Sequence, residues 1–270
     1  MKIIVITGAS DGIGAEIARQ LARREGAQVA LVLAARNEAR LAQVASQCAE
    51  WGAQTLVLPT DVSLEPDCRA LVVATAQRFG QIDVLINNAG MSAQALFDQV
   101  KADDLAWYEQ LMRVNLWGSV WCTHAALPFL KQSRGSIVAV SSLAGLFGVP
   151  GRTAYSASKF ALTGFFEALR AELKTAGVSV TTAYPGVVAT QIRHHGLNAA
   201  GQTAGSSGLK EDKAMSVEEC ARLILQGLQS RQREVVMTTK GKLGRWLKLL
   251  APAQVEAMAL AALKDEVKPS

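Results

Sequence analysis

The sequence has few cysteines and no cysteine pattern. Its 270 residues include four, Cys48, Cys68, Cys122 and Cys220, and none belongs to a C-x-x-C pair. This scatter argues against a disulfide-stapled secreted scaffold and against a cysteine zinc site. We therefore expect free thiols in a reducing compartment, and a cytoplasmic protein.

The sequence also lacks the patterns of membrane, metal and nucleic-acid proteins. No apolar run approaches the roughly 20 residues that span a bilayer, and no charged leader precedes an apolar segment. His124 lies in a helical stretch, and His194 and His195 have no carboxylate or cysteine cluster at ligand spacing, so we expect no metal. The net charge of +5 is mild and dispersed until the last quarter of the chain, so we expect no nucleic-acid partner.

Half of the residues are hydrophobic, and they fall in short β-rich runs that alternate with helical patterns. Such alternation predicts one α/β domain over 1–270, with a doubly wound parallel sheet of the Rossmann type and helices on both faces. Ligands of such sheets bind at the carboxyl ends of the strands. We expect strands at 3–6, 29–33, 55–58, 84–86, 137–140, 178–183 and 234–237, and helices at 13–24, 38–51, 65–79, 103–130, 152–176 and 217–230.

Glycines follow the first strand, as Gly8, Gly12 and Gly14. Glycine allows a tight turn and lets backbone amides approach a pyrophosphate at the start of a helix. The spacing is G-x-x-x-G-x-G, not the G-x-G-x-x-G of the standard dinucleotide fingerprint. We interpret this turn as a nucleotide-binding site.

The second strand ends in Ala34-Ala35-Arg36-Asn37. NAD-binding folds carry an Asp or Glu about 20 residues past the glycines, which holds the ribose 2′-hydroxyl. Here that carboxylate is missing, and Arg36 offers a guanidinium suited to a 2′-phosphate. The alternative is an ordinary solvated arginine.

Tyr155 and Lys159 stand four residues apart in a segment with helical spacing of apolar residues. Residues at i and i+4 share one helix face, and an ammonium beside a phenol lowers the pKa of the phenol. A tyrosine tuned in this way can act as a general acid or base. Alone, such a pair is more often a surface contact, so its meaning depends on the other motifs.

Taken together, the motifs resemble those of the classical short-chain dehydrogenases/reductases over about residues 2–190. They are Thr7 to Gly14, Asn87-Asn88-Ala89-Gly90, Asn115, Ser142, Tyr155 with Lys159, and Pro185-Gly186. The stretch 141–166 also resembles, more loosely, the 11β-hydroxysteroid dehydrogenase branch.

This resemblance implies a role for each matching residue. Tyr155 would donate and accept the proton, Ser142 would hydrogen-bond the substrate oxygen, and Asn115 would hold a water of the proton relay. Lys159 would bind the nicotinamide ribose and favour the ionised tyrosine. The implied cofactor contacts are Gly8, Ser10, Gly12, Ile13, Gly14, Arg36, Asp61, Val62, Asn88, Ala89, Gly90, Tyr155, Lys159, Pro185, Gly186, Val188 and Thr190. In this family the helix that here carries Trp107, Trp117 and Trp121 usually packs on a partner, so we expect core or interface roles and a homodimer or homotetramer.

Two further segments depart from the alternating pattern. Glycine and serine replace periodicity in 187–216, which predicts a substrate lid. Residues 239–265 predict a C-terminal helical extension in which Lys240, Lys242 and Lys248 interleave with leucines and Trp246. Its apolar face would pack on the substrate cleft or on a neighbouring subunit; peripheral contact with an anionic membrane is the less favoured alternative.

Two functions from different classes remain. The first is an NADP(H)-dependent oxidoreductase that moves a hydride between nicotinamide and a ketone or aldehyde carbon, or the carbon of a secondary alcohol. The second is a catalytically silent NADP(H)-sensing binding protein. Retention of Ser142, Tyr155, Lys159 and Asn115 favours the enzyme.

Overall fold

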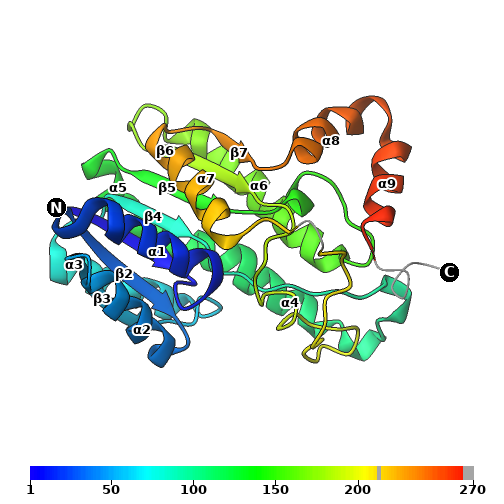
Figure 1. The fold of residues 1–270 in the computed structure, drawn as a ribbon, viewed down its shortest axis with the longest axis horizontal. Helices are drawn as coiled ribbons and strands as arrows, with labels where there is room; N and C mark the ends of the chain where they lie inside the picture. The colour runs from blue at the N-terminus through cyan, green and yellow to red at the C-terminus, as the bar shows by residue number, and fades with distance from the viewer. Residues whose placement is uncertain (212–213, 264–270) are drawn as a thin grey trace.

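A computed structural model of the chain describes residues 1–211 and 214–263. Helices and strands alternate along most of it (Figure 1). The strands are β1 Lys2–Thr7, β2 Val29–Ala35, β3 Gln54–Pro59, β4 Val84–Asn87, β5 Ser136–Val140, β6 Ser179–Tyr184 and β7 Glu234–Val236. The helices are α1 Gly12–Glu25, α2 Glu38–Ala49, α3 Glu65–Phe79, α4 Ala106–Met112, α5 Gly118–Ser133, α6 Thr153–Glu172, α7 Val217–Gln229, α8 Thr239–Leu250 and α9 Pro252–Ala261.

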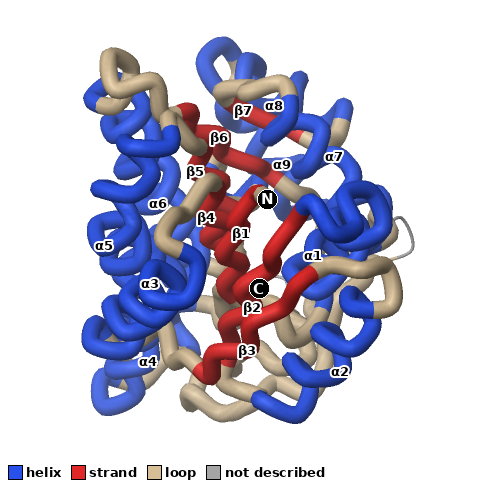
Figure 2. Tube along the Cα trace, turned by 90° about the vertical axis from the view of Figure 1, so that its left-hand side faces the viewer, coloured by secondary structure: helices blue, strands red, loops and turns tan. Residues whose placement is uncertain are grey.

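The strands of the described residues form one seven-stranded parallel sheet in the order β3-β2-β1-β4-β5-β6-β7. Figure 2 shows the sheet between two helical layers, with α3, α4, α5 and α6 on one side and α1, α2 and α7 on the other. Central strands such as β4 and β5 are fully buried, which explains their continuous apolar runs. The predicted doubly wound fold is confirmed.

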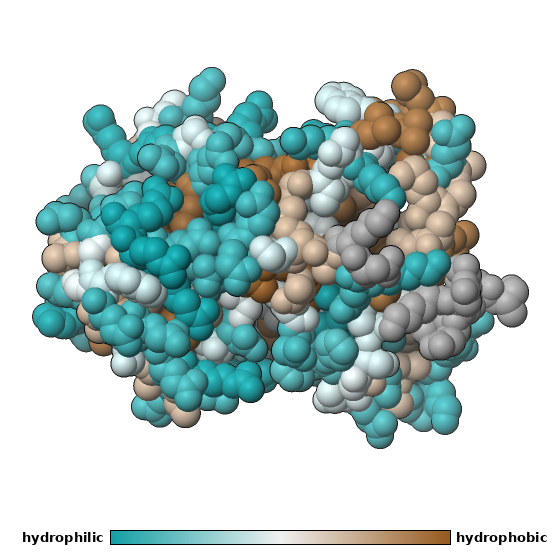
Figure 3. Space-filling view, viewed as in Figure 1, coloured by the Kyte–Doolittle hydropathy of each residue, from teal (hydrophilic) through white to brown (hydrophobic). Residues whose placement is uncertain are grey.

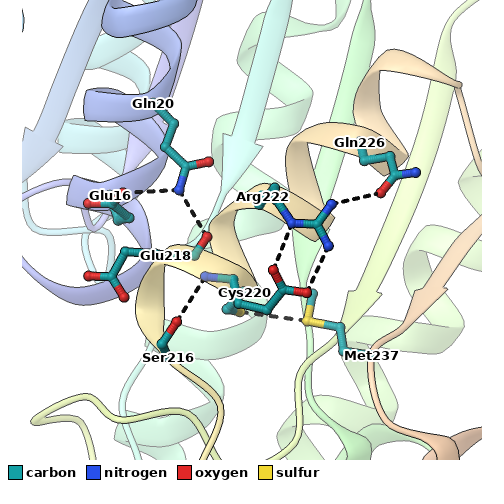
Figure 4. Close-up of polar contacts among 9 residues, drawn as sticks. Glu16, Gln20, Ser216, Glu218, Cys220, Arg222, Gln226 and Met237 are labelled. Carbon is teal, nitrogen blue, oxygen red and sulfur yellow. Dashed lines mark hydrogen bonds and ion pairs between the residues drawn. The ribbon is translucent and has the colours of Figure 1, made fainter.

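Side-chain hydrogen bonds fix the start of α7 and join it to α1. Ser216 caps α7 by accepting from the backbone N–H of Glu219 at 3.1 Å. The side-chain amide of Gln20 on α1 donates to the carbonyl of Glu218 at 2.9 Å, which joins the two helices (Figure 4). These contacts lie on the face of the sheet opposite α6.

The helical stretch predicted over 103–130 is present, as helical turns that run without a break from Ala106 to Ser133, but it is not one uniform α-helix. It divides into α4, a π-helical turn at Arg113–Trp117, and α5. Apolar spacing alone does not distinguish an α-turn from a π-turn, and π-turns often occur at functional sites.

The C-terminal extension consists of two helices, because Pro252 ends α8 and begins α9. Residues 264–265 of the predicted extension lie outside the described residues. The buried face of α8 is formed by Gly241 and Gly244, where an added Cβ at Gly241 would lie 2.4 Å from Leu143. The apolar side chains of α8 do not cover the cleft of this chain: they point outward, with Leu250 87% exposed, and contribute to the brown patch at the upper right of Figure 3. Their packing on a neighbouring subunit or on a membrane stays a prediction.

The segment 187–216 has no regular helix or strand up to Ser216, apart from residues 212–213, which lie outside the described residues. Isolated bridges tie it to the body, among them Ala93 with Leu197. In the described part of the chain, no helix combines the length and the apolar character that crossing a membrane requires.

Candidate active site

The motifs meet where the strand order reverses. Along the chain β1 is followed by β2 and β3 on one side of it, whereas β4 lies on its other side. Such a reversal opens a crevice at the carboxyl ends of the two central strands. The glycine turn follows β1 and the Asn88 motif follows β4, so both lie at this crevice.

The glycine turn needs glycine for steric reasons. Gly8 has φ +67°, and an added Cβ would lie 2.8 Å from the Cα of Ala89. An added Cβ on Gly14 would lie 2.3 Å from the carbonyl oxygen of Gly8. The turn leads into the amino end of α1, whose backbone N–H groups and dipole suit a pyrophosphate. These residues therefore fit a dinucleotide.

Asn88 holds this turn in place. Its side-chain amide donates to the carbonyls of Thr7 at 3.0 Å and Gly8 at 3.1 Å. The hydroxyl of buried Thr7 in turn accepts from the backbone N–H groups of Asn88 and Ala89, each at 3.0 Å. Sequence reasoning placed Asn88 to Gly90 at the ribose; it did not find that Asn88 and Thr7 join β1 to β4 beneath the turn.

The predicted adenine end lies on the β2 and β3 side of the crevice. Arg36 is exposed directly after β2, and Asp61 and Val62 follow β3. The carboxylate of Asp61 accepts from the backbone N–H of Ser63 at 2.9 Å and from its hydroxyl at 2.7 Å. Sequence reasoning missed Arg40 in the first turn of α2, whose guanidinium lies 3.4 Å from Asp11 of the glycine turn. Arg40 partly neutralises a carboxylate that would otherwise repel a phosphate.

The Tyr155 and Lys159 side chains lie together on α6, as the spacing predicted. Lys159 is only 3% exposed; its Nζ donates to the carbonyl of Val140 at 3.0 Å and lies 5.8 Å from the centre of the Tyr155 ring. Burial lowers the pKa of Lys159, while the nearby Tyr155 acts in the opposite direction. A phenol and an ammonium held in this way can move a proton at the crevice.

Two more predicted residues lie near Tyr155 and Lys159: Ser142, shortly after β5, and Asn115, in the π-turn. The Ser142 hydroxyl accepts from the backbone N–H of Ala144 at 3.2 Å. Asn115 is fully buried in the π-turn; its amide donates to the carbonyl of Met91 at 3.0 Å and to the hydroxyl of Ser158 at 2.9 Å. An added Cβ on Gly90 would lie 3.2 Å from Asn115 Oδ1 and 3.6 Å from Lys159 Nζ, so these three residues are close neighbours.

Residues 185–190 connect the group of Ser142, Tyr155, Lys159 and Asn115 with the glycine turn. The carbonyl of Pro185 accepts from the backbone N–H of Leu143, next to Ser142, at 2.9 Å. At the other end, the methyl group of Thr190 would lie 3.3 Å from a Cβ added to Gly12. Gly186 and buried Val188 lie between them, so the residues predicted to flank nicotinamide line the gap between phosphate turn and Tyr155.

One residue beside Tyr155 was missed entirely. Arg152, three residues earlier, is buried, and its guanidinium stacks over the Tyr155 ring at 4.4 Å from the ring centre. It also donates to the hydroxyl of Ser92. Nothing in the spacing of apolar residues distinguished this arginine from a solvated one.

The structure also bears on the predictions made for the tryptophans and for metal binding. Trp107 is buried, and its indole N–H donates to the carbonyl of Ala199 at 3.2 Å, so it has a core role. Trp117 is exposed and stacks on Trp121 at 5.8 Å between ring centres; its packing on a partner stays a prediction, as does the oligomeric state. Within residues 1–211 and 214–263, no three His, Cys, Asp or Glu side chains gather as a metal site.

Comparison with known proteins points to the family that the sequence motifs resemble. A family model described as short chain dehydrogenase matches residues 2–200. The chain is 35% identical to "11-beta-hydroxysteroid dehydrogenase A" of Sesamum indicum over 261 residues, which is 94% of this chain and 73% of that protein. It is 34% identical to "Dehydrogenase/reductase SDR family protein 7-like" of Dictyostelium discoideum over 274 residues, 99% of this chain and 83% of that protein.

Solved structures of similar fold carry nicotinamide cofactors. A short-chain dehydrogenase of Sphingobium yanoikuyae in complex with NADPH has a TM-score of 0.76 and 29% identity, over 96% of this chain and 95% of that chain. A short-chain dehydrogenase/reductase of Burkholderia phymatum in complex with NAD has a TM-score of 0.79 and 25% identity, over 94% of each chain. These two proteins differ in cofactor, so the choice in this chain must be argued from its own residues.

Proposed function

Since this chain belongs to the short-chain dehydrogenase family, we propose that it is an NADP(H)-dependent oxidoreductase acting on a ketone, an aldehyde or a secondary alcohol. The supporting observation is the group formed by Ser142, Tyr155, Lys159 and Asn115, which lies beside a glycine turn that fits a dinucleotide. The bound cofactor supplies or accepts the hydride.

The protein's own residues handle the substrate oxygen. The Tyr155 hydroxyl gives a proton to the carbonyl oxygen in reduction, and the phenolate takes it back in oxidation. The Ser142 oxygen accepts from Ala144, which leaves its O–H free to donate to the same substrate oxygen. Lys159 holds the ribose and favours the ionised tyrosine, and Asn115 holds the water that continues the proton relay.

The substrate class follows from the surroundings of Tyr155. An apolar cluster that includes Ala93, Ala95, Trp107 and Tyr155 packs with Leu197 from the 187–216 segment. This supports an apolar carbonyl compound covered by that segment as a lid. Because similar proteins are named 11-beta-hydroxysteroid dehydrogenases, steroid ketones belong in the test panel with retinoid and small aromatic carbonyls.

The direct test follows NADPH oxidation by the purified protein across this panel, with Tyr155→Phe as the matched variant. Removal of a positioned acid costs about 10²–10⁴-fold in rate, while NADPH affinity should stay nearly unchanged. Activity of the variant within about threefold of the parent would refute the role of Tyr155. Tight NADPH binding by the parent without any turnover would instead favour the sensing protein.

The preference for NADP(H) depends on Arg36. Hydrogen bonds to charged groups contribute about 1.5–3 kcal/mol, or about ten- to a hundredfold in affinity. Arg36→Asp should therefore erase the preference, because a carboxylate repels the 2′-phosphate and accepts from the 2′-hydroxyl. The measurement is kcat/KM with NADPH and NADH for both proteins; equal use of the two cofactors by the parent would show that Arg36 has no such role.

A further inference from the structure

Arg152 occupies a costly position. It is 7% exposed and directly precedes the first residue of α6, where the helix dipole disfavours a cation. Among the described residues no carboxylate forms an ion pair with it, and its buried Nε has no acceptor. A buried cation without a counter-charge destabilises the fold, so its presence suggests a role in the site.

The contacts of Arg152 are with the catalytic tyrosine and with the segment after β4. The guanidinium Cζ lies 4.4 Å from the Tyr155 ring centre, closer than Lys159 Nζ at 5.8 Å. Its Nη2 donates to Ser92, whose backbone carbonyl accepts from Leu197 of the 187–216 segment at 2.9 Å. Arg152 is therefore fixed between Tyr155 and the predicted lid.

We propose that Arg152 is a positioning residue that clamps the Tyr155 ring and, as a second cation beside Lys159, stabilises the phenolate required for alcohol oxidation. This inference rests on the proposed function of Tyr155 as general acid and base. A cation over an aromatic face is attracted by the ring, more strongly when both are desolvated. The attraction increases when the ring carries a full negative charge, because opposite charges favour each other's charged form.

The other charged groups around the phenol do not replace this contribution. Lys159 is the second cation, on the same helix. Burial lowers the pKa of Arg152, Tyr155 opposes this change, and Arg193 of the 187–216 segment adds a smaller lowering effect. The Arg193 guanidinium is itself paired with Glu211. Ser142 and Asn115, the remaining members of the catalytic group, are neutral.

A titration of Tyr155 tests the proposal without any substrate. The tyrosinate absorbance of the parent is followed against pH, and that of a Tyr155→Phe protein is subtracted to remove the other two tyrosines. The same difference is measured in an Arg152→Met background, which keeps length and apolar contact but loses the charge. We expect ionisation of Tyr155 at about one pH unit higher in Arg152→Met. An unchanged midpoint would overturn the proposal.

Two further variants separate the charge from the local structure. Arg152→Lys keeps a cation but not the planar stack, and we expect a smaller upward change in the midpoint than with Met. Ser92→Ala removes the acceptor of Arg152 and keeps the stack, and we expect the midpoint to stay near that of the parent. A change in Ser92→Ala as large as in Arg152→Met would overturn the proposal in favour of a purely structural contact. Should Arg152→Met not fold, the same titration is made with Arg152→Gln, which also lacks the charge, and an unchanged midpoint there overturns the proposal equally.

Kinetics provide the second readout. In alcohol oxidation the O–H proton passes to the phenolate, so the acidic limb of the kcat/KM profile should move upward with the titration midpoint, with NADP⁺ affinity unchanged. A loss equal at every pH would indicate a structural role and overturn the proposal. A keto acid and its methyl ester are compared as well: selective loss of the acid in Arg152→Met would identify an anchor for a substrate carboxylate instead. Absence of turnover in the parent would refute the proposed function, while the titration would still decide the role of Arg152.

Discussion

Thr7 links the two central strands through a single hydroxyl, so its removal tests the construction of the glycine turn. The side chain is 2% exposed, and its oxygen accepts from the backbone N–H groups of Asn88 and Ala89. The same hydroxyl donates to the carbonyl of Ile86 at 3.3 Å. Valine has a similar shape but no hydrogen-bonding group, so Thr7→Val removes these bonds with little change in packing.

The expected loss follows from the two amides left without an acceptor. A buried donor that loses its partner costs about 1–3 kcal/mol. Both amides are partly buried and water can reach them to some degree, which places the total at about 2–4 kcal/mol. The turn that Asn88 holds should also loosen, so affinity for the dinucleotide should fall.

Urea unfolding followed by linear extrapolation measures this free energy. Thr7→Ser is the matched control, because it keeps the hydroxyl and loses only a methyl group; it should stay within about 1 kcal/mol of the parent. NADPH affinity is measured on the same three proteins. A valine variant as stable as the serine variant, with equal NADPH affinity, would show that the hydroxyl does not hold the crevice together.

Two more substitutions test the crevice. Gly14→Ala places a Cβ 2.3 Å from the Gly8 carbonyl oxygen, so it should lower the free energy of unfolding by about 1–3 kcal/mol and remove most of the NADPH affinity. Urea unfolding and NADPH titration measure these two losses. Gly164→Ala in α6, where a Cβ meets nothing within 4 Å, is the control and should keep both stability and affinity. Lys159→Met should lower both turnover and NADPH affinity, and an unchanged affinity would contradict contact with the ribose. Because burial lowers the pKa of Lys159 in the folded state, the unfolded state binds more protons just below the ordinary lysine pKa of about 10.4, so parent stability rises with pH in that window. Lys159→Met should flatten this rise in urea unfolding at neutral and alkaline pH, and an identical slope in both proteins would refute the effect of burial.

Periodicity and spacing along the chain were enough for much of this molecule. Apolar runs separated by helical patterns predicted the parallel sheet, because strands covered on both faces must be apolar throughout. Tyr155 and Lys159 could be placed together because residues four apart share a helix face. The glycines after β1 predicted a tight turn, because glycine tolerates backbone conformations that other residues rarely adopt. The positive φ of Gly8 and Gly12 confirms the turn.

Other features depended on contacts between segments that are distant in sequence. Thr7 and Asn88 are joined across 81 positions, and Arg152 meets Ser92 across 60, so no local pattern contained either contact. Nor did the apolar spacing of α8 reveal that the small Gly241 and Gly244, not the leucines, approach Leu143 and Phe147 of the same chain. The sequence by itself determined which residue types stand at each strand end; only the tertiary structure decided which of them touch, because those contacts depend on how the strands and loops are brought together in three dimensions.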